Sequence, residues 1–288
     1  MRFAAIADVH GNYLALEAVL ADIRAHGIKD IVNLGDMASG ALDARRTMDM
    51  LMALDAVHVL GNHDRYLIDR LPEKMGAWDR PAHAQLDAKH LDWLRAVTAT
   101  RVFRDQVFLC HATPDNDEVY WLEKLLPNGT VHMAALETIE AAAKGIEQRL
   151  ILCAHSHIAR AVRLGDGRLI VNPGSVGCPG YRDNHPPIPH VVEVGTPDAR
   201  YAILERVGNA WQVTFRHVPY DHETMAELAR ISHGFKRIGA SNQRKLLCRN
   251  DFCNDSRKPR CRRSVAQNGL ILEWLSAGLW KPRSMPDW

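Results

Sequence analysis

Residues 3–10 read Phe-Ala-Ala-Ile-Ala-Asp-Val-His, a short apolar run that ends abruptly in an acidic residue and a histidine. An apolar run of this length bounded by polar residues predicts a buried β-strand. Apolar residues between 16 and 23 then recur at helical spacing, which predicts a helix after the strand. Residues that follow a strand in such a sheet lie at its carboxyl edge, so we expect Asp8 and His10 there.

The same strand-and-helix pattern repeats downstream. Residues 31–34 and 57–60 are further apolar runs, and a helical pattern at 48–52 lies between them. Alternation of this kind predicts a parallel sheet covered by helices.

Beyond residue 80 the pattern changes twice. Helices are expected at 84–96 and 133–144, on either side of a strand at 107–110. From Leu150 the chain is rich in strand signals, which predicts a second, largely antiparallel sheet, and a final helix is expected to begin near Asp221. The expected strands of this second half are 150–154, 169–172, 190–194, 201–204 and 211–218.

The composition indicates a globular protein of one large domain or two modest ones, because 47% of the 288 residues are hydrophobic. No apolar run is long enough for a membrane span or for the core of a signal peptide. The six cysteines form no regular framework, which favours a reducing compartment over a secreted disulfide scaffold. A cytoplasmic protein is therefore expected.

Charge divides the chain unevenly. From Lys236 onward there are 12 basic and 4 acidic residues, which leaves 24 basic and 30 acidic residues in the first 235. We therefore expect a folded, acidic domain at 1–235 and a basic, irregular tail at 236–288. The arginines of the tail could attract nucleic acid or an anionic surface, although a solvated tail is favoured. The three cysteines of the tail lack a fourth ligand for zinc.

Polar side chains of a few kinds follow each predicted strand of the first 160 residues. Because the carboxyl ends of neighbouring strands lie side by side in an open α/β sheet, these side chains should converge on one rim. Carboxylates, imidazoles and an amide suit Mn, Fe, Zn, Co or Ni, and they are numerous enough for two ions. The candidate residues are Asp8, His10, Asp36, Asn62, His63, Asp64, His111, His155 and His157.

Each of these motifs taken alone has an ordinary structural explanation. Asp8 or Asp36 could cap a helix, and His111 could be a hydrogen-bonded core residue. Placement at five strand ends favours a metal site instead. Asn12 and Arg65 lie close to the motifs and could contact a phosphate, or only cap and solvate neighbouring helices.

The ordered motifs resemble those of the calcineurin-like metallophosphoesterases over roughly residues 1 to 235. The segment 172–177, Asn-Pro-Gly-Ser-Val-Gly, is similar to the compact bacterial and archaeal branch related to small phosphodiesterases and symmetrical dinucleotide hydrolases. The resemblance implies a four-layer α/β/β/α sandwich of two mixed sheets with flanking helices. The matching motifs are Asp8-x-His10, Gly35-Asp36, Gly61-Asn62-His63-Asp64, His111 and His155-x-His157.

The resemblance also implies a role for each motif residue. Asp8, His10 and His157 would bind one divalent metal, while Asn62, His111 and His155 would bind a second. Asp36 would bridge them. Two metals about 3.5 to 4 Å apart can convert a bridging water into the hydroxide that attacks phosphorus.

Two further features follow from the same comparison of motifs. His63 matches the family's proton donor to the leaving group, and Asp64 could orient His63 or raise its pKa. Family members usually carry glycine before the His-x-His pair, whereas this chain has Ala154. A methyl group at that position tolerates ordinary strand angles but not a positive φ.

The implied reaction is hydrolysis of a phosphomonoester or a phosphodiester, on a small phosphorylated or nucleotide-like substrate. Three alternatives stay open: a nuclease of the same superfamily, a noncatalytic metal-dependent binding protein, and a protein phosphatase. The acidic body argues against the nuclease, and retention of His63 argues against the binding protein. The residues that could border the substrate, or have only structural roles, are Trp78, Trp93, Trp121, Arg182 and His185.

Overall fold

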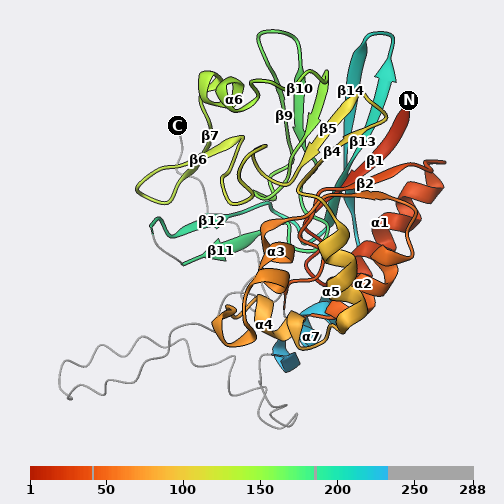
Figure 1. Ribbon diagram of the computed structural model, residues 1–288, viewed down its shortest axis with the longest axis vertical. Coiled ribbons are helices and arrows are strands. Elements are labelled where there is room, and N and C mark those ends of the chain that lie inside the picture. The colour runs from red at the N-terminus through yellow and green to blue at the C-terminus, as the bar shows by residue number, and fades with distance from the viewer. Residues whose placement is uncertain (41, 185–186, 233–288) are drawn as a thin grey trace, which may run out of the picture.

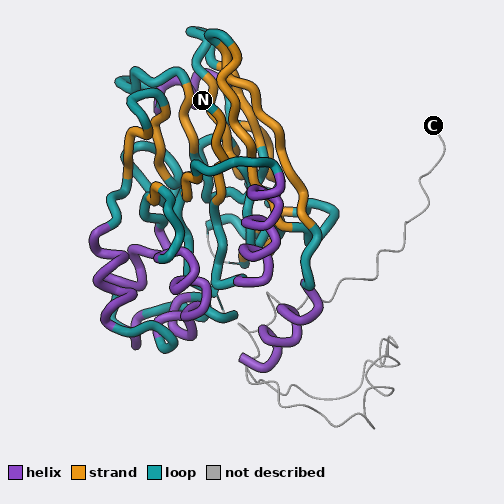
Figure 2. The backbone as a smooth tube through the Cα atoms, turned by 90° about the vertical axis from the view of Figure 1, so that its right-hand side faces the viewer, coloured by secondary structure: helices purple, strands orange, loops and turns teal. Residues whose placement is uncertain are grey.

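The computed structural model describes residues 1–40, 42–184 and 187–232 (Figure 1). Two five-stranded sheets pack face to face, and helices cover their outer faces. Figure 2 shows the strands of both sheets grouped together with the helices around them. The four-layer α/β/β/α sandwich of two mixed sheets is therefore confirmed. The predicted tail at 236–288 lies outside the described residues.

The first sheet has the strand order β14-β13-β1-β2-β3. Strands β1, β2 and β3 are parallel, as the repeated strand-and-helix pattern predicts, and Ala5 pairs with Val32. Strand β13 lies antiparallel on the other side of β1, with Ala4 opposite Ile203. The bounds are β1 (Arg2–Ile6), β2 (Ile31–Asn33), β3 (Val57–His58), β13 (Ala199–Val207) and β14 (Ala210–Val218).

The second sheet has the order β4-β5-β8-β10-β9, with three parallel strands in the middle and an antiparallel strand at each edge. The expectation of a largely antiparallel second sheet is therefore wrong. Strands β13 and β14 join the first sheet instead, because the first six residues of β13 are buried and need cover on both faces. The bounds are β4 (Thr100–Phe103), β5 (Val107–Cys110), β8 (Leu150–Leu152), β9 (Arg160–Arg163) and β10 (Leu169–Asn172).

The core between the sheets is built from alternate residues of their strands. Phe3 and Val32 of the first sheet meet Leu109 and Leu152 of the second, and all four are fully buried. The intervening residues of β1, such as Ile6, pack against helices on the other face. This period of two gives the first sheet one face against the second sheet and one face against helices.

Seven α-helices are present in the described part of the chain. The predicted helix at 84–96 begins later, at Ala88, because the Asp87 side chain accepts from the His90 N–H and caps it. The predicted helix at 133–144 is also shorter, because its first residue pairs in a β-hairpin. The bounds are α1 (Tyr13–Ala25), α2 (Ala44–Met52), α3 (Asn62–Asp69), α4 (Asp79–His83), α5 (Ala88–Ala96), α6 (Leu136–Ala142) and α7 (His222–Ser232), with a 3-10 turn at Pro72–Lys74.

Two small hairpins stand outside the sheets. They were not anticipated as hairpins, because their strands are only three residues long. Their strands are β6 (Glu123–Leu125) with β7 (Val131–Met133), and β11 (Tyr181–Asp183) with β12 (His190–Val192). Among the residues that the structure describes, no helix is both long and apolar enough to cross a lipid bilayer.

Candidate metal centre

The loops that follow β1, β2, β5 and β8 meet at one rim of the sandwich, where the sequence predicted a site. Backbone hydrogen bonds join these loops in pairs. Asp8 N–H donates to Gly35 at 3.0 Å, and Ala154 N–H donates to the His111 carbonyl at 2.6 Å. The candidate residues of separate motifs are therefore held side by side by the chain itself.

Left-handed backbone marks this rim. Seven non-glycine residues of the described chain have positive φ, and five of them are candidate ligands. A positive φ costs an ordinary side chain about 1 kcal/mol or more, so it persists where the surrounding structure enforces it. The five candidate ligands are Asp8 (φ 52°), His10 (49°), Asp36 (55°), His155 (67°) and His157 (61°).

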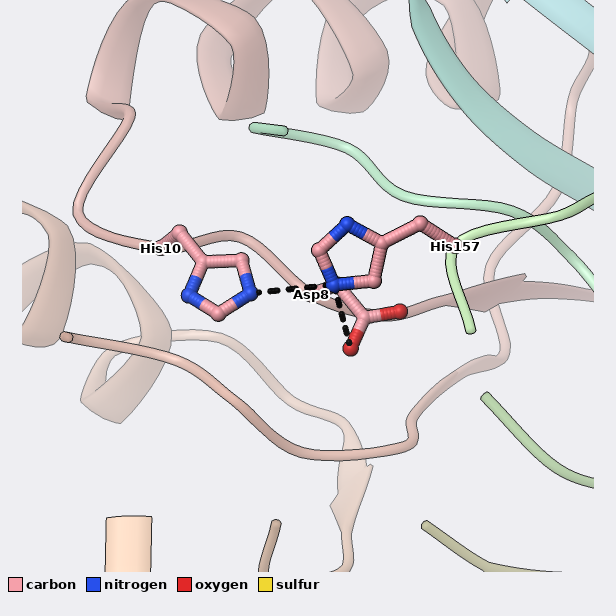
Figure 3. A group of neighbouring side chains, drawn as sticks. All are labelled: Asp8, His10 and His157. Atoms are coloured by element: carbon pink, nitrogen blue, oxygen red, sulfur yellow. Dashed lines mark hydrogen bonds and ion pairs between the residues drawn. The ribbon is translucent and has the colours of Figure 1, made fainter. Parts of the chain in front are cut away.

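The first ligand group comprises Asp8, His10 and His157, whose ligand atoms lie within 4.8 Å of one another (Figure 3). Nδ1–H of His10 donates to the Ser39 carbonyl at 3.0 Å, and Nδ1–H of His157 donates to Cys178. Burial lowers the pKa of His10 to about 4, and it also lowers that of His157, so each ring is neutral. Both Nε2 atoms therefore carry lone pairs, and they face each other at 3.2 Å.

Two lone pairs at this distance repel unless a cation lies between them. The Asp8 carboxylate also favours a cation at this place. It is fully buried, neither of its oxygens has a hydrogen-bond partner among the described residues, and burial raises its pKa well above the ordinary value. A buried carboxylate without a partner is costly, and a bound divalent cation removes that cost. The residues of this group therefore fit a metal ion.

The second group comprises Asp36, His111 and His155, again with ligand atoms within 4.8 Å of one another. Nδ1–H of His111 donates to the Leu34 carbonyl at 2.7 Å, so Nε2 is the nitrogen that faces the other members of the group. Nε2–H of His155 donates to the Glu118 carbonyl at 3.0 Å, which leaves Nδ1. Hydrogen bonds of this kind orient the rings of metal-binding histidines.

Asn62 and Asp36 complete this arrangement. Oδ1 of Asn62 lies 3.1 Å from Nε2 of His111. Oδ2 of Asp36 lies 3.4 Å from the same nitrogen and 3.9 Å from Nε2 of His10 in the first group. The carboxylate of Asp36 thus lies between the two groups, where a bridging ligand belongs. The donor set of oxygen and nitrogen atoms suits divalent transition metals.

The negative charge of the centre raises the pKa of one histidine, His111. Burial lowers the pKa of His111, but the charge of Asp36, a hydrogen bond to its carboxylate and the charge of Asp8 more than offset this. The resulting pKa of His111 is raised to about 10. A field that stabilises an imidazolium also attracts a metal cation.

Comparison with known proteins agrees with this geometry. Residues 1–196 match the family model described as the calcineurin-like phosphoesterase superfamily domain. The chain belongs to this superfamily. An uncharacterised protein of Methanocaldococcus jannaschii is 28% identical to this phosphoesterase over 198 residues, which cover 61% of this chain and 76% of the relative.

A solved structure is also similar to this phosphoesterase. It is described as a metallophosphoesterase from Sphaerobacter thermophilus and has 27% sequence identity and a TM-score of 0.61. The match covers 81% of this chain and 94% of that chain. The family resemblance carried by the five motifs is therefore confirmed.

His63, the expected proton donor, lies beside the first ligand group. Its backbone N–H donates to Oδ1 of Asp36 at 2.9 Å, and its ring centroid is 5.6 Å from that of His10. Nδ1 lies 2.7 Å from Oδ1 of Asp79, the first residue of α4, which is 3% exposed. Burial lowers the pKa of His63, but the Asp36 charge and the hydrogen bond to Asp79 more than offset it, raising the pKa to about 9.

Asp64 does not contact the ring of His63. Its carboxylate instead accepts three backbone N–H groups, from Asp36 at 2.8 Å, Met37 at 2.9 Å and Gly61 at 3.1 Å. Successive residues of a helix point about 100° apart, so Asp64 faces the loops while His63 faces the site. The expectation that Asp64 orients His63 is wrong, and Asp79 takes that place.

Sequence reasoning missed Asp79 because it lies outside the five motifs, on a short helix that was not predicted. The close approach of the motif loops to one another could not be predicted from the sequence either. A Cβ added to Gly61 would lie 2.2 Å from Oδ1 of Asp36, so a side chain there would displace the Asp36 carboxylate. Ala154 has no positive φ, and the methyl group is therefore tolerated.

The two residues thought able to contact phosphate have structural partners. Oδ1 of Asn12 caps α1 through the Ala15 N–H, and its amide donates to the Gly177 carbonyl and the Tyr220 hydroxyl. Arg65 binds the carboxylate of Asp117 with two hydrogen bonds, at 2.7 and 2.8 Å, and also reaches Glu118. Neither residue is oriented as a phosphate ligand in this structure.

Of the three tryptophans considered, only Trp78 lies beside the candidate metal centre. Its ring centroid is 5.4 Å from that of His10 and 6.4 Å from that of His63. Trp93 packs instead on His58, and the indole N–H of Trp121 donates to a backbone carbonyl in α6. Arg182 lies in β11, and His185 lies outside the described residues.

Proposed function

We propose that this phosphoesterase hydrolyses small phosphodiesters or phosphomonoesters with two divalent metal ions as cofactors and His63 as general acid. The observation that carries the proposal is the position of Asp36, which contacts both ligand groups and His63. Its carboxylate touches both ligand groups through Oδ2 and receives the His63 N–H through Oδ1. The side chain of Asp36 thus contacts both metal-binding groups and the backbone of the candidate acid.

The residues divide the work between binding and proton transfer. Two ions held by Asp8, His10 and His157, and by Asn62, His111 and His155, with Asp36 between, would activate water and stabilise charge on the phosphoryl oxygens. The ligands are mostly buried, whereas the His63 side chain is 26% exposed. Its Nε2 is therefore available to donate a proton to the oxygen of the leaving group.

Asp79 supports this role of His63. Because Asp79 accepts the Nδ1–H, the ring is held in one orientation and the second proton is on Nε2. The charge of the carboxylate also favours the imidazolium form that can donate. A noncatalytic binding protein would have no need for this pair.

We further propose that manganese is among the ions accepted, that the substrate is a small or nucleotide-like phosphate ester, and that the protein works in the cytoplasm. Three observations support these points. The donor set is all oxygen and nitrogen, which suits manganese among other ions. The site is framed by aromatic rings, described below. The three cysteines of the described chain, Cys110, Cys153 and Cys178, are free thiols.

The test is hydrolysis of bis(p-nitrophenyl) phosphate and p-nitrophenyl phosphate by metal-stripped protein resupplied separately with Mn, Ni, Co, Zn and Mg. Activity should return with metal and be lost in Asp36→Asn. His63→Ala should slow hydrolysis of an ester with an alkyl leaving group by about a hundredfold or more, and that of the p-nitrophenyl esters much less, because p-nitrophenolate leaves nearly without a proton. His132→Ala serves as the control, because His132 is exposed on the β6–β7 hairpin. Two bound ions without turnover of any ester would instead favour a metal-dependent binding protein.

A further inference from the structure

Three aromatic residues that no motif contains lie against the metal centre. Tyr120 precedes the β6–β7 hairpin, Tyr181 begins β11, and His190 begins β12. The two hairpins lie side by side at one flank of the sandwich (Figure 1), and the turn at Gly129 closely approaches the backbone of Pro189. We call Tyr120, Tyr181 and His190 the tyrosine wall.

The hydrogen bonds of the wall form a chain in which Tyr181 donates to Tyr120 and Tyr120 donates to His190. Nδ1–H of His190 donates to the Ile188 carbonyl at 3.0 Å, so Nε2 is the acceptor for the Tyr120 hydroxyl at 3.1 Å. The Tyr120 oxygen then accepts from the Tyr181 hydroxyl. All three donors are therefore occupied, two of them within the wall and the third by the Ile188 carbonyl. What remains for a ligand is the ring surface and neutral oxygen atoms.

The wall touches one ligand of each metal-binding group. The ring centroid of Tyr181 is 4.9 Å from that of His157 in the first group. The centroid of Tyr120 is 5.0 Å from that of His155 in the second group. Both tyrosines are half-buried, so part of each ring surface stays accessible beside the ligands. A phosphoryl group bound between the two groups would therefore lie next to this wall.

His63 and Trp78 contact the centre at a different place. Both rings pack on His10, at 5.6 and 5.4 Å between centroids, and His10 in turn contacts His157 at 5.0 Å. The ring contacts thus run in series from His63 through the first ligand group to Tyr181. The leaving group must lie next to its proton donor, His63. The substituent that stays on phosphorus is then the group beside the wall.

Two arginines near the wall are already paired with carboxylates, so neither is free to bind a second phosphate. Arg65 on α3 is bound by Asp117 and Glu118, and Arg160 on β9 is bound by the buried Glu123 at 2.9 Å. Both guanidinium groups are thus neutralised. Aromatic faces instead favour flat rings, which stack on them with or without hydrogen bonds.

We propose that the tyrosine wall binds a planar ring on the retained group of a phosphodiester, either an aryl group or the base of a nucleoside. The inference rests on the proposed function. In the reaction, water supplies the new oxygen on phosphorus, the bond to the leaving oxygen breaks, and that oxygen takes a proton. The products are an alcohol and a phosphomonoester that carries the ring. A monoester substrate has no retained group, so its hydrolysis does not use the wall, whereas the monoester product of a diester still carries the ring that the wall binds.

The experiment compares three diesters that share p-nitrophenolate as leaving group and differ in the retained group: methyl, phenyl or thymidine 5′. Because the leaving group is constant, differences in kcat/KM report contacts of the retained group. The wild-type protein should prefer phenyl and thymidine over methyl by about tenfold, mainly through KM, as a single aromatic contact supplies. A further preference for thymidine over phenyl would name the nucleoside as the ligand.

In Tyr181→Leu and Tyr120→Leu, the ratio of phenyl to methyl kcat/KM should fall toward one. In Tyr181→Phe, which keeps the ring, the ratio should persist, as it should in the control Phe215→Leu on the surface of β14. Two substituted positions guard against one misfolded variant, and metal content is measured for each. A ratio near one in the wild type, or one unchanged in both leucine variants, overturns the proposal.

If no diester is hydrolysed by metal-loaded protein, the proposed function fails, and the wall is tested by binding alone. Calorimetry then compares phenyl phosphate with methyl phosphate on the metal-loaded protein. Tighter binding of phenyl phosphate that is lost in Tyr181→Leu supports the wall. Equal affinity for the two ligands overturns it.

Discussion

Nδ1 of His63 lies 2.7 Å from Oδ1 of Asp79, although 16 residues separate them in the chain. The same oxygen accepts the Ser39 hydroxyl at 3.2 Å, and the Ser39 carbonyl accepts Nδ1–H of His10. One buried carboxylate therefore connects the candidate acid to the loop that carries a metal ligand. We infer that Asp79 positions His63 rather than reacting itself.

Asp79→Asn should slow hydrolysis most for esters whose leaving group is a basic alcohol. Such a leaving oxygen needs a proton, whereas p-nitrophenolate leaves nearly without one. We expect kcat to fall about tenfold or more for an alkyl leaving group, and much less for p-nitrophenol. The measurement is kcat for both esters, with Asp92→Asn, an exposed carboxylate on α5, as control. Equal losses for the two esters would show that Asp79 only maintains the fold.

Asp8→Asn should stabilise the metal-free protein and weaken metal binding. The amide removes a buried carboxylate whose oxygens accept no hydrogen bond, and asparagine tolerates the positive φ of this position. In EDTA, the free energy of unfolding should rise by about 1 kcal/mol or more. In Mn²⁺, the rise in Tm seen for the wild-type protein should shrink, because stabilisation by a ligand follows its affinity. Thermal unfolding with and without Mn²⁺ measures both effects, and an undiminished Mn²⁺ response would exclude Asp8 as a ligand.

Asp64→Asn should have the opposite effect on the metal-free protein. Its carboxylate accepts N–H groups from three loop residues, and an amide offers one acceptor oxygen and turns an NH₂ group toward a donor. The free energy of unfolding in EDTA should fall by about 1–3 kcal/mol. Urea unfolding of Asp64→Asn and Asp8→Asn under the same conditions gives the comparison. A shift of the same sign in both variants would contradict the assignment of one carboxylate to the fold and the other to metal.

His58 should make stability depend on pH. Burial lowers its pKa to about 4, with a smaller contribution from Arg101, and its Nδ1 faces the amide of Asn33 at 3.3 Å. The unfolded chain binds a proton near pH 6.5, so this contribution is fully present above pH 6.5 and is lost as the pH falls toward 4. Between pH 7.5 and 5.0 the wild-type protein should lose about 2 kcal/mol more than His58→Gln. Urea unfolding in EDTA at the two pH values checks this, and parallel losses in both proteins would refute it.

The candidate ligand residues could be predicted from the sequence because the relevant rule is local. A short apolar run that ends in Asp8 and His10, or in His155 and His157, is a strand followed by its own site residues. Parallel strands bring those ends to one edge whatever the rest of the chain does. The two mixed sheets and the convergence of seven candidate ligands followed from this rule and from the resemblance.

Sheet membership of the late strands could not be predicted in this way. Strand β13 shows six successive buried residues, which a sequence pattern recognises as a covered strand without naming its neighbour. Its partner is β1, where Ala5 pairs with Ala202 nearly two hundred residues away. Burial on both faces, rather than local alternation, decided that β13 and β14 complete the first sheet.

By itself, the sequence determined which side chains are the candidates for the chemistry: the acidic, amide and imidazole groups that stand at strand ends. Only the tertiary structure decided what each does. The carbonyls of Leu34 and Glu118 determine which nitrogen of His111 and His155 faces the candidate metal centre. Helical geometry turned Asp64 away from its neighbour, and packing of α4 brought Asp79 in its place. Hydrogen bonds between distant segments depend on where the whole chain packs, and spacing along the sequence does not encode that position.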